Sequence, residues 1–168
     1  MEFHTIEPIY DKNSKILILG SFPSVKSRET GFFYGHPQNR FWKVLANIFD
    51  EEKPETSEEK KKFLKRNGIA LWDVIESCEI KGSSDASVKD VKVNDIGALL
   101  KKHPSIGRIF VNGKTAQKLY DKHILPKIKI SAEVLPSTSP ANAAWGFDRL
   151  SERWLAALDG VRPATDDE

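Results

Sequence analysis

The chain has 168 residues, 39% of them hydrophobic and 30% charged, which is enough for one compact domain with a substantial core. Its formal net charge of +2 neither requires nor excludes a polyanionic partner. The single cysteine, Cys78, excludes an intramolecular disulfide and any four-cysteine metal site. We expect one domain over residues 1–158, a flexible acidic tail over residues 159–168, and a soluble cytoplasmic protein without a membrane-spanning segment.

The first expected element is a strand over residues 15–20, where a β-branched apolar run ends at a glycine. Residues 21–38 lack periodicity and form a long loop, and a connection of that length in a compact domain is typically functional. A helix begins at Phe41, because apolar residues then recur at helical spacing, and Asn39 is placed to cap its first turn.

The middle of the chain continues this alternation. A capping box of Thr56 and Glu59 opens a helix that the Asn67-Gly68 pair ends. Residues 69–72 then form a short strand. We expect a polar loop over residues 79–90 and a helix near residues 94–103.

The last third contributes strands over residues 108–111 and 133–136 and helices over residues 115–121 and 150–158. Strands and helices that alternate through one domain predict a three-layer α/β/α sandwich around a central, mostly parallel sheet of four to five strands. Ligands of such folds bind beyond the carboxyl ends of the strands. The loops that begin after residues 20, 111 and 136 are therefore the candidate site.

The first of these loops begins with Gly-Ser-Phe-Pro-Ser over residues 20–24. Small residues at a strand exit let backbone N–H groups face a ligand oxygen, although a tight turn without a ligand explains the same composition. Further along, the run Thr-Gly-Phe-Phe-Tyr-Gly-His-Pro-Gln-Asn-Arg-Phe-Trp spans residues 30–42. Phe32, Phe33 or Tyr34 could stack on a nucleobase, or they could pack against the following helix.

Other polar residues in these loops allow more than one role. The amide of Asn39 can orient a water molecule or cap the helix. His36 has no metal-ligating companion at suitable spacing, so a structural hydrogen bond is expected and a zinc site is not. Asp73 and Asp85 are carboxylates without a defined partner. The third loop, Leu-Pro-Ser-Thr-Ser-Pro-Ala-Asn-Ala over residues 135–143, suits phosphate contacts or a simple surface turn.

Together, the motifs GSFPS, TGFFYGHPQNRFW and LPSTSPANA resemble, in this order, those of the uracil-DNA glycosylase superfamily. The combination with GIALWDVIESCEIKGSSDAS looks like the branch of hypoxanthine-DNA glycosylases. Phe22 stands where better-known branches carry a water-activating Asn or Asp, and Ser137 stands where uracil-specific enzymes carry His or Asn.

The resemblance implies a role for each matched residue. Asn39 would position the hydrolytic water, Tyr34 would stack on the flipped base, and the backbone of Ser21 and Phe22 would contact a base carbonyl. Asn112 would either read the base edge or cap the helix that follows it. The expected DNA contacts are Ser137, Thr138, Ser139, Pro140, Ala141 and Asn142, of which the last three would fill the gap left in the base stack.

The implied function is that of a monofunctional DNA glycosylase of base excision repair. It would act as a monomer without metal or cofactor, remove hypoxanthine from damaged double-stranded DNA and leave an abasic site; single-stranded DNA is a further candidate substrate. Uracil, as in mismatches, is the alternative substrate, with thymine and xanthine as further candidates. A binding module for damaged DNA without catalysis and a nucleotide-binding α/β protein unrelated to DNA are alternatives of other classes.

Overall fold

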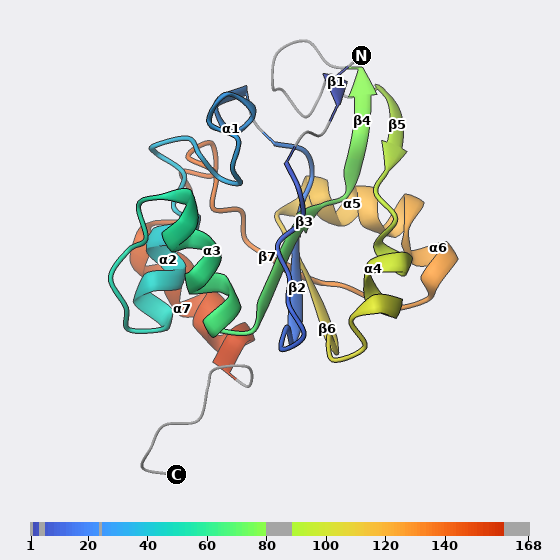
Figure 1. Cartoon of the computed structure of the whole chain (residues 1–168). Coiled ribbons are helices and arrows are strands. Elements are labelled where there is room, and N and C mark those ends of the chain that lie inside the picture. The colour runs from blue at the N-terminus through green and yellow to red at the C-terminus, as the bar shows by residue number, and fades with distance from the viewer. Residues whose placement is uncertain (1, 4–5, 24, 80–88, 160–168) are drawn as a thin grey trace.

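The computed structural model describes residues 2–3, 6–23, 25–79 and 89–159, and four parallel strands form its centre (Figure 1). β2 is buried at every position, because it has a neighbour on each side and helices over both faces. This sheet confirms the expected α/β class. The strands are β2 (Ile16–Gly20), β3 (Ile69–Asp73), β6 (Arg108–Asn112) and β7 (Glu133–Leu135), in the spatial order β3-β2-β6-β7.

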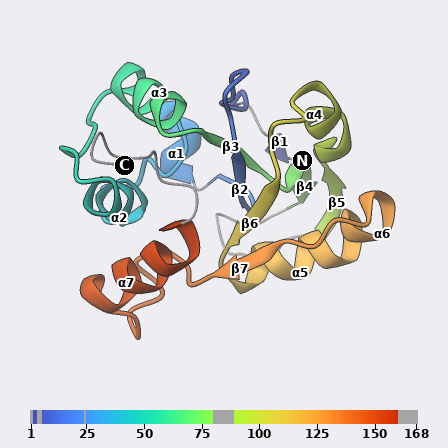
Figure 2. The same ribbon diagram turned by 90° about the horizontal axis from the view of Figure 1, so that it is seen from below.

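Helices cover both faces of the sheet, as Figures 1 and 2 show from two directions. Two separate hydrophobic clusters fill the space between the layers, one beneath each set of helices. Among the residues that the structure describes, none of the helices combines the length and the hydrophobicity of a membrane-spanning segment. One face carries α1 (Val25–Thr30), α2 (Phe41–Ile48), α3 (Ser57–Arg66) and α7 (Phe147–Leu158), and the other carries α4 (Ile96–Lys102), α5 (Lys114–His123) and α6 (Leu125–Ile128).

Two parts of the structure correct the sequence-based expectations. The long first loop contains the six-residue helix α1, which is too short to produce a periodic apolar pattern. The polar loop expected over residues 79–90 is shorter, because its ends belong to β4 (Ile75–Glu79) and β5 (Lys89–Val93). These strands form a small antiparallel sheet with β1 (Glu2–Phe3). The rest of that loop, with Asp85, and the tail from residue 160 lie outside the described residues.

The predicted start and end of α3 are confirmed. Thr56 is the N-cap, and its hydroxyl accepts a hydrogen bond from the Glu59 N–H at 3.0 Å. Asn67 is the C-cap, and Gly68 follows with φ +72°, a conformation that glycine adopts without strain.

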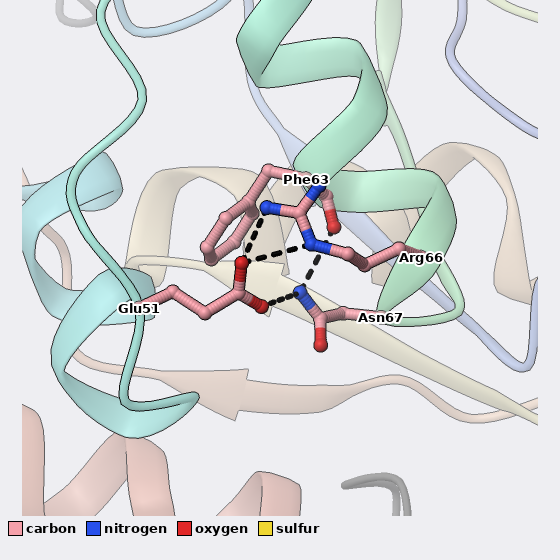
Figure 3. Close-up of polar contacts among 4 residues, drawn as sticks. All are labelled: Glu51, Phe63, Arg66 and Asn67. Atoms are coloured by element: carbon pink, nitrogen blue, oxygen red, sulfur yellow. Dashed lines mark hydrogen bonds and ion pairs between the residues drawn. The ribbon is translucent and has the colours of Figure 1, made fainter.

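A polar cluster joins this C-terminus to the segment after α2 (Figure 3). The carboxylate of Glu51 accepts hydrogen bonds from Arg66 and from Asn67 Nδ2, and Asn67 Nδ2 also donates to the Phe63 carbonyl. Partial burial alone would raise the pKa of Glu51, but the hydrogen bonds and the charge of Arg66 outweigh it and lower this pKa. Ionised Glu51 therefore helps to hold α2 against α3.

Candidate active site

The loops that leave the carboxyl ends of the strands enclose a cavity of about 380 Å³. Its walls come from the segments 20–23, 33–39, 112–115 and 137–141, together with Ser27 and Asp73. The fold thus brings together the three loops that the sequence singled out. The predicted site residues that line the cavity are Ser21, Phe22, Tyr34, Asn39, Asn112, Ser137, Thr138, Ser139, Pro140 and Ala141.

One wall of the cavity is formed where the backbone of Gly20 passes close to two side chains. Gly20 is paired with Asp73 across β2 and β3. A Cβ atom at this position would lie 2.4 Å from Asp73 Oδ1 and 2.9 Å from Tyr34 Oη. The glycine is therefore required for close approach. Backbone bonds from Val74 N–H to the Gly20 carbonyl (2.8 Å) and from Ile75 N–H to the Ser21 carbonyl (3.0 Å) hold the start of the loop in place.

Tyr34 presents an aromatic ring to this cavity. It has φ +52°, and its ring stacks on Phe41 with centroids 4.1 Å apart and an angle of 18° between the planes. Burial, followed by the charge of Asp73, raises the pKa of Tyr34 well above its ordinary value, and Asn112 opposes the rise. The phenol is thus neutral at physiological pH. Its hydroxyl is buried beside Asp73 and Asn112.

The other aromatic residues of this loop divide between packing and the site. Phe32 and Phe33 are 4% and 2% exposed and belong to the core beneath α2, which is the packing role that the sequence left open. Phe33 also reaches the cavity wall. Phe22, near the start of the same connection, also lines the cavity, with the guanidinium of Arg28 5.3 Å from its ring centroid.

Asn39 has the geometry of a fixed amide. Its Oδ1 accepts hydrogen bonds from the Phe41 N–H at 3.0 Å and from the Thr138 hydroxyl at 2.8 Å. The N-cap of α2 is Arg40, so Asn39 binds the first helical N–H from one position further out than expected. The neighbouring His36 accepts a hydrogen bond from the Gln38 N–H through Nδ1, which is the structural role predicted for it.

Thr138 connects Asn39 to the end of β6. It is fully buried, and its N–H donates to Asn112 Oδ1 at 3.1 Å. Asn112 Nδ2 in turn donates to the Thr138 hydroxyl at 3.0 Å. The N-cap of α5 is Gly113, without a side-chain bond, so Asn112 does not cap that helix.

The segment that follows β7, which we call the Ser-Pro loop (residues 136–146), is held by its own side chains. The hydroxyls of Ser137 and Ser139 accept from the N–H groups of Ser139 and Ala141, each at 3.1 Å. Asn142 Nδ2 donates to the Ser137 carbonyl at 3.0 Å. Pro140 and Ala141 lie between these bonds; both are exposed and both line the cavity. The loop therefore has a defined shape without a partner.

Arg40 is a residue of this region that sequence reasoning missed. Its guanidinium donates to the carbonyls of Ser139 (3.1 Å), Asn142 (3.2 Å) and Trp145, and its N–H donates to the Thr138 carbonyl (3.1 Å). Arg40 therefore fixes the Ser-Pro loop to the start of α2. Its place next to Asn39 in the motif was the available signal, but contacts across about a hundred residues of sequence have no local pattern.

Asp73 is the carboxylate of the cavity, and it is 4% exposed at the end of β3. Sequence analysis singled out this carboxylate but defined no interaction partner for it. The fold places it beside Gly20 and near the Tyr34 hydroxyl. Within the residues that the structure covers, no group of three or more His, Cys, Asp or Glu side chains is arranged to bind a metal ion.

A row of lysines leaves the cavity along α5. Lys114 lines the cavity, and Lys118 and Lys122 follow at intervals of four residues, so all three lie on one exposed face of the helix. The segment 114–129 contains five lysines and one acidic residue, Asp121. This face is therefore strongly basic, although the net charge of the whole chain is small.

Comparisons with known proteins agree on one family. Residues 7–158 match the model of the Uracil DNA glycosylase superfamily. A protein of Methanosarcina acetivorans named hypoxanthine DNA glycosylase is 37% identical over 151 residues, which cover 89% of this chain and 94% of that protein. A protein of the same name from Methanosarcina barkeri is 35% identical and covers 80% and 85%. A solution NMR structure from Methanosarcina acetivorans, provisionally described as a uracil DNA glycosylase, has a TM-score of 0.79 at 35% identity and covers 93% and 96%.

Proposed function

Because the chain belongs to the uracil DNA glycosylase superfamily, we propose that it is a DNA glycosylase that removes hypoxanthine from DNA. The observation that carries the proposal is the convergence of Asn39, Tyr34, Asp73 and the Ser-Pro loop on one cavity. At about 380 Å³ this cavity lies near the lower end of the range of ligand sites, about 300–1,000 Å³, which suits a single nucleotide.

The reaction is hydrolysis of the bond between C1′ of the sugar and N9 of the base. A base within a duplex is out of reach, so the nucleotide is flipped into the cavity, at a cost of a few kcal/mol that is smallest for weakly paired bases. The free face of Tyr34 stacks on the flipped base, opposite the face that Phe41 covers. The C1′–N9 bond breaks through an oxocarbenium-like state, and its electron pair leaves with the base. The oxygen of water then adds to C1′, and a proton of that water ends on the departed base, so that the products are an abasic sugar and neutral hypoxanthine.

Asp73 supports selection of a deaminated base. Hypoxanthine carries an N1–H donor where adenine carries an unprotonated N1. An ionised carboxylate can accept hydrogen bonds but cannot donate them. A carboxylate has about four lone-pair sites, so Asp73 can accept from N1–H in addition to the contacts it already makes. Adenine, of nearly equal size, would place a lone pair against the same oxygen. The carboxylate therefore favours the damaged base over its normal parent.

The partner is duplex DNA that extends past the lesion along α5. Lys114, Lys118 and Lys122 span about 12 Å at 1.5 Å per residue, which is a length of about three to four base steps. The Ser-Pro loop supplies further contacts to phosphates through the O–H groups of Ser137 and Ser139. Positive side chains along one helix and hydroxyls at the cavity mouth together favour a double strand.

Base release from end-labelled duplexes tests the proposal. Hypoxanthine, uracil, xanthine and adenine are placed at one position, and alkali reveals abasic sites. Hypoxanthine is expected to be released fastest and adenine not at all, and Asn39→Ala is expected to abolish release. Asn47→Ala, which changes an exposed asparagine of α2, is the matched control and keeps the wild-type rate.

Each other outcome identifies a specific error. If uracil were released faster than hypoxanthine, uracil would be the main substrate. Tight binding of a hypoxanthine duplex without release of any base would make the protein a binding module. Strand cleavage without alkali would show a lyase step, with Lys114 of the cavity wall as the amine to test.

A further inference from the structure

Two backbone N–H groups determine how the side-chain amides of Asn39 and Asn112 are oriented. The Phe41 N–H can only donate, so the Asn39 atom that it contacts at 3.0 Å must be the carbonyl oxygen. The same argument applies at Asn112, where the Thr138 N–H contacts the side chain at 3.1 Å and identifies that atom as oxygen.

These assignments set the direction of the bonds between the two asparagines. With its oxygen used by the Thr138 N–H, Asn112 presents its NH2 to the Thr138 hydroxyl, which must accept. The hydroxyl hydrogen is then directed to Asn39 Oδ1 at 2.8 Å. The chain of donors runs from Asn112 through Thr138 to Asn39, and no member can be reversed without facing two donors or two acceptors toward each other.

Asn39 Oδ1 thus receives two hydrogen bonds, one for each lone pair, while its NH2 has no partner in the described part of the chain. Asn39 and Thr138 both line the cavity, and Thr138 is fully buried. The group that Asn39 can offer to a flipped nucleotide is therefore a donor.

We propose that Thr138, oriented by Asn112, is a positioning residue that makes Asn39 act on the reacting nucleotide as a hydrogen-bond donor. This rests on the proposed glycosylase function and refines the role of its catalytic residue. An NH2 donor can hold the oxygen of the attacking water, leaving a second lone pair for C1′, or stabilise the charge that develops on the leaving base. It cannot take a proton from water. It also gives Thr138 a role inside the protein in place of a phosphate contact.

The variant Asn39→Asp replaces the side-chain NH2 by an oxygen without changing the shape of the side chain, so it removes the hydrogen-bond donor and leaves an acceptor in its place. Its carboxylate keeps the bonds to Phe41 and Thr138 and presents oxygen to the cavity instead of NH2. A donor role predicts a loss of about 100-fold to 1,000-fold in the single-turnover rate of hypoxanthine release. If Asn39 acted by accepting a proton or a hydrogen bond from water, the same variant would match or exceed the wild type, and that result would overturn the proposal.

The variants Thr138→Val and Thr138→Ser test the positioning role. Valine has nearly the same shape without the hydroxyl, and we expect the single-turnover rate to fall about 10-fold to 100-fold while the KM for DNA stays within about twofold. Serine restores the hydroxyl and should restore the rate. Equal losses in both variants, or a change in KM alone, would refute the role.

A measurement independent of activity keeps this test separate from the proposed function. In NMR spectra of the free protein, the side-chain NH2 of Asn112 should exchange with solvent more slowly than that of Asn39, and Thr138→Val should remove this protection. If wild type releases no base but the exchange pattern holds, the function fails and the orientation stands. If base is released and Asn112 shows no protection, the orientation fails and the function stands.

Discussion

Loss of the Arg40 side chain should loosen the Ser-Pro loop and weaken DNA binding. The variant Arg40→Ala removes the guanidinium bonds to the carbonyls of Ser139, Asn142 and Trp145. Hydrogen bonds to charged groups contribute about 1.5–3 kcal/mol each, but these carbonyls are partly accessible and regain water, so the expected net loss is about 2–3 kcal/mol. If DNA has to restore the loop shape on binding, this loss corresponds to about 30-fold to 160-fold weaker affinity.

The assay is the Kd for an uncleaved lesion duplex by fluorescence anisotropy, together with hydrogen exchange of the backbone amides of residues 139–145. Arg40→Lys is the matched control, because it keeps the charge but one ammonium cannot span the three carbonyls, and it should give an intermediate Kd. An unchanged Kd in Arg40→Ala, with wild-type exchange in the loop, would refute the reasoning.

Three further predictions concern other parts of the molecule. The pKa of Glu51 is lowered in the folded state, so ionised Glu51 stabilises the protein at pH values above its ordinary pKa of 4.5. The variant Glu51→Gln should therefore be less stable than the wild type in urea unfolding at neutral pH. This difference in the free energy of unfolding should vanish as the pH falls through the folded-state pKa. The double variant Lys118→Gln/Lys122→Gln should reduce the slope of log Kd against log salt by about 2, equally for lesion and undamaged duplexes. Gly20→Ala should fold but release base at least about 10-fold more slowly, because its Cβ displaces Asp73.

The lysine variant has a matched control, and each of the three predictions has a result that would contradict it. Lys61→Gln/Lys65→Gln removes the same charge at the same spacing from exposed positions of α3 and should leave the salt slope unchanged. An equal effect of both lysine pairs would mean that only total charge matters. A stability difference at Glu51 that persists at low pH, or wild-type base release by Gly20→Ala, would contradict the respective prediction.

Sequence patterns predicted the central sheet because its strands are short apolar runs and its helices carry periodic apolar faces or capping boxes. They failed where the signal is not local. β5 reads Lys-Asp-Val-Lys-Val and becomes a strand through pairing with β4, although its composition resembles a polar loop. Helix α1 has only six residues and no apolar stripe.

The candidate site was predictable to the extent that its residues lie in recognisable motifs. Asn39 and Tyr34 were identified in this way, and the fold places both at the cavity. The bonds that orient Asn39 were not predictable, since Thr138 and Asn112 lie far from it in the sequence and meet it only in the folded structure. Thr138 is an example. A hydroxyl in a loop suggests a contact with a partner at the surface, but Thr138 is buried and its hydroxyl contacts other residues of the protein.

The two hydrophobic clusters on opposite faces of the sheet separate two properties that selection or engineering can change independently. Tyr34 and Trp145 pack against the cluster beneath α2 and α7, so substitutions there alter the ring that stacks on the base and the loop that contacts phosphates. The other cluster supports α5 through Ala116 and Tyr120, and with it the lysine face. Repacking that second cluster should change how long the protein stays on undamaged DNA between lesions, without altering how the flipped base is stacked.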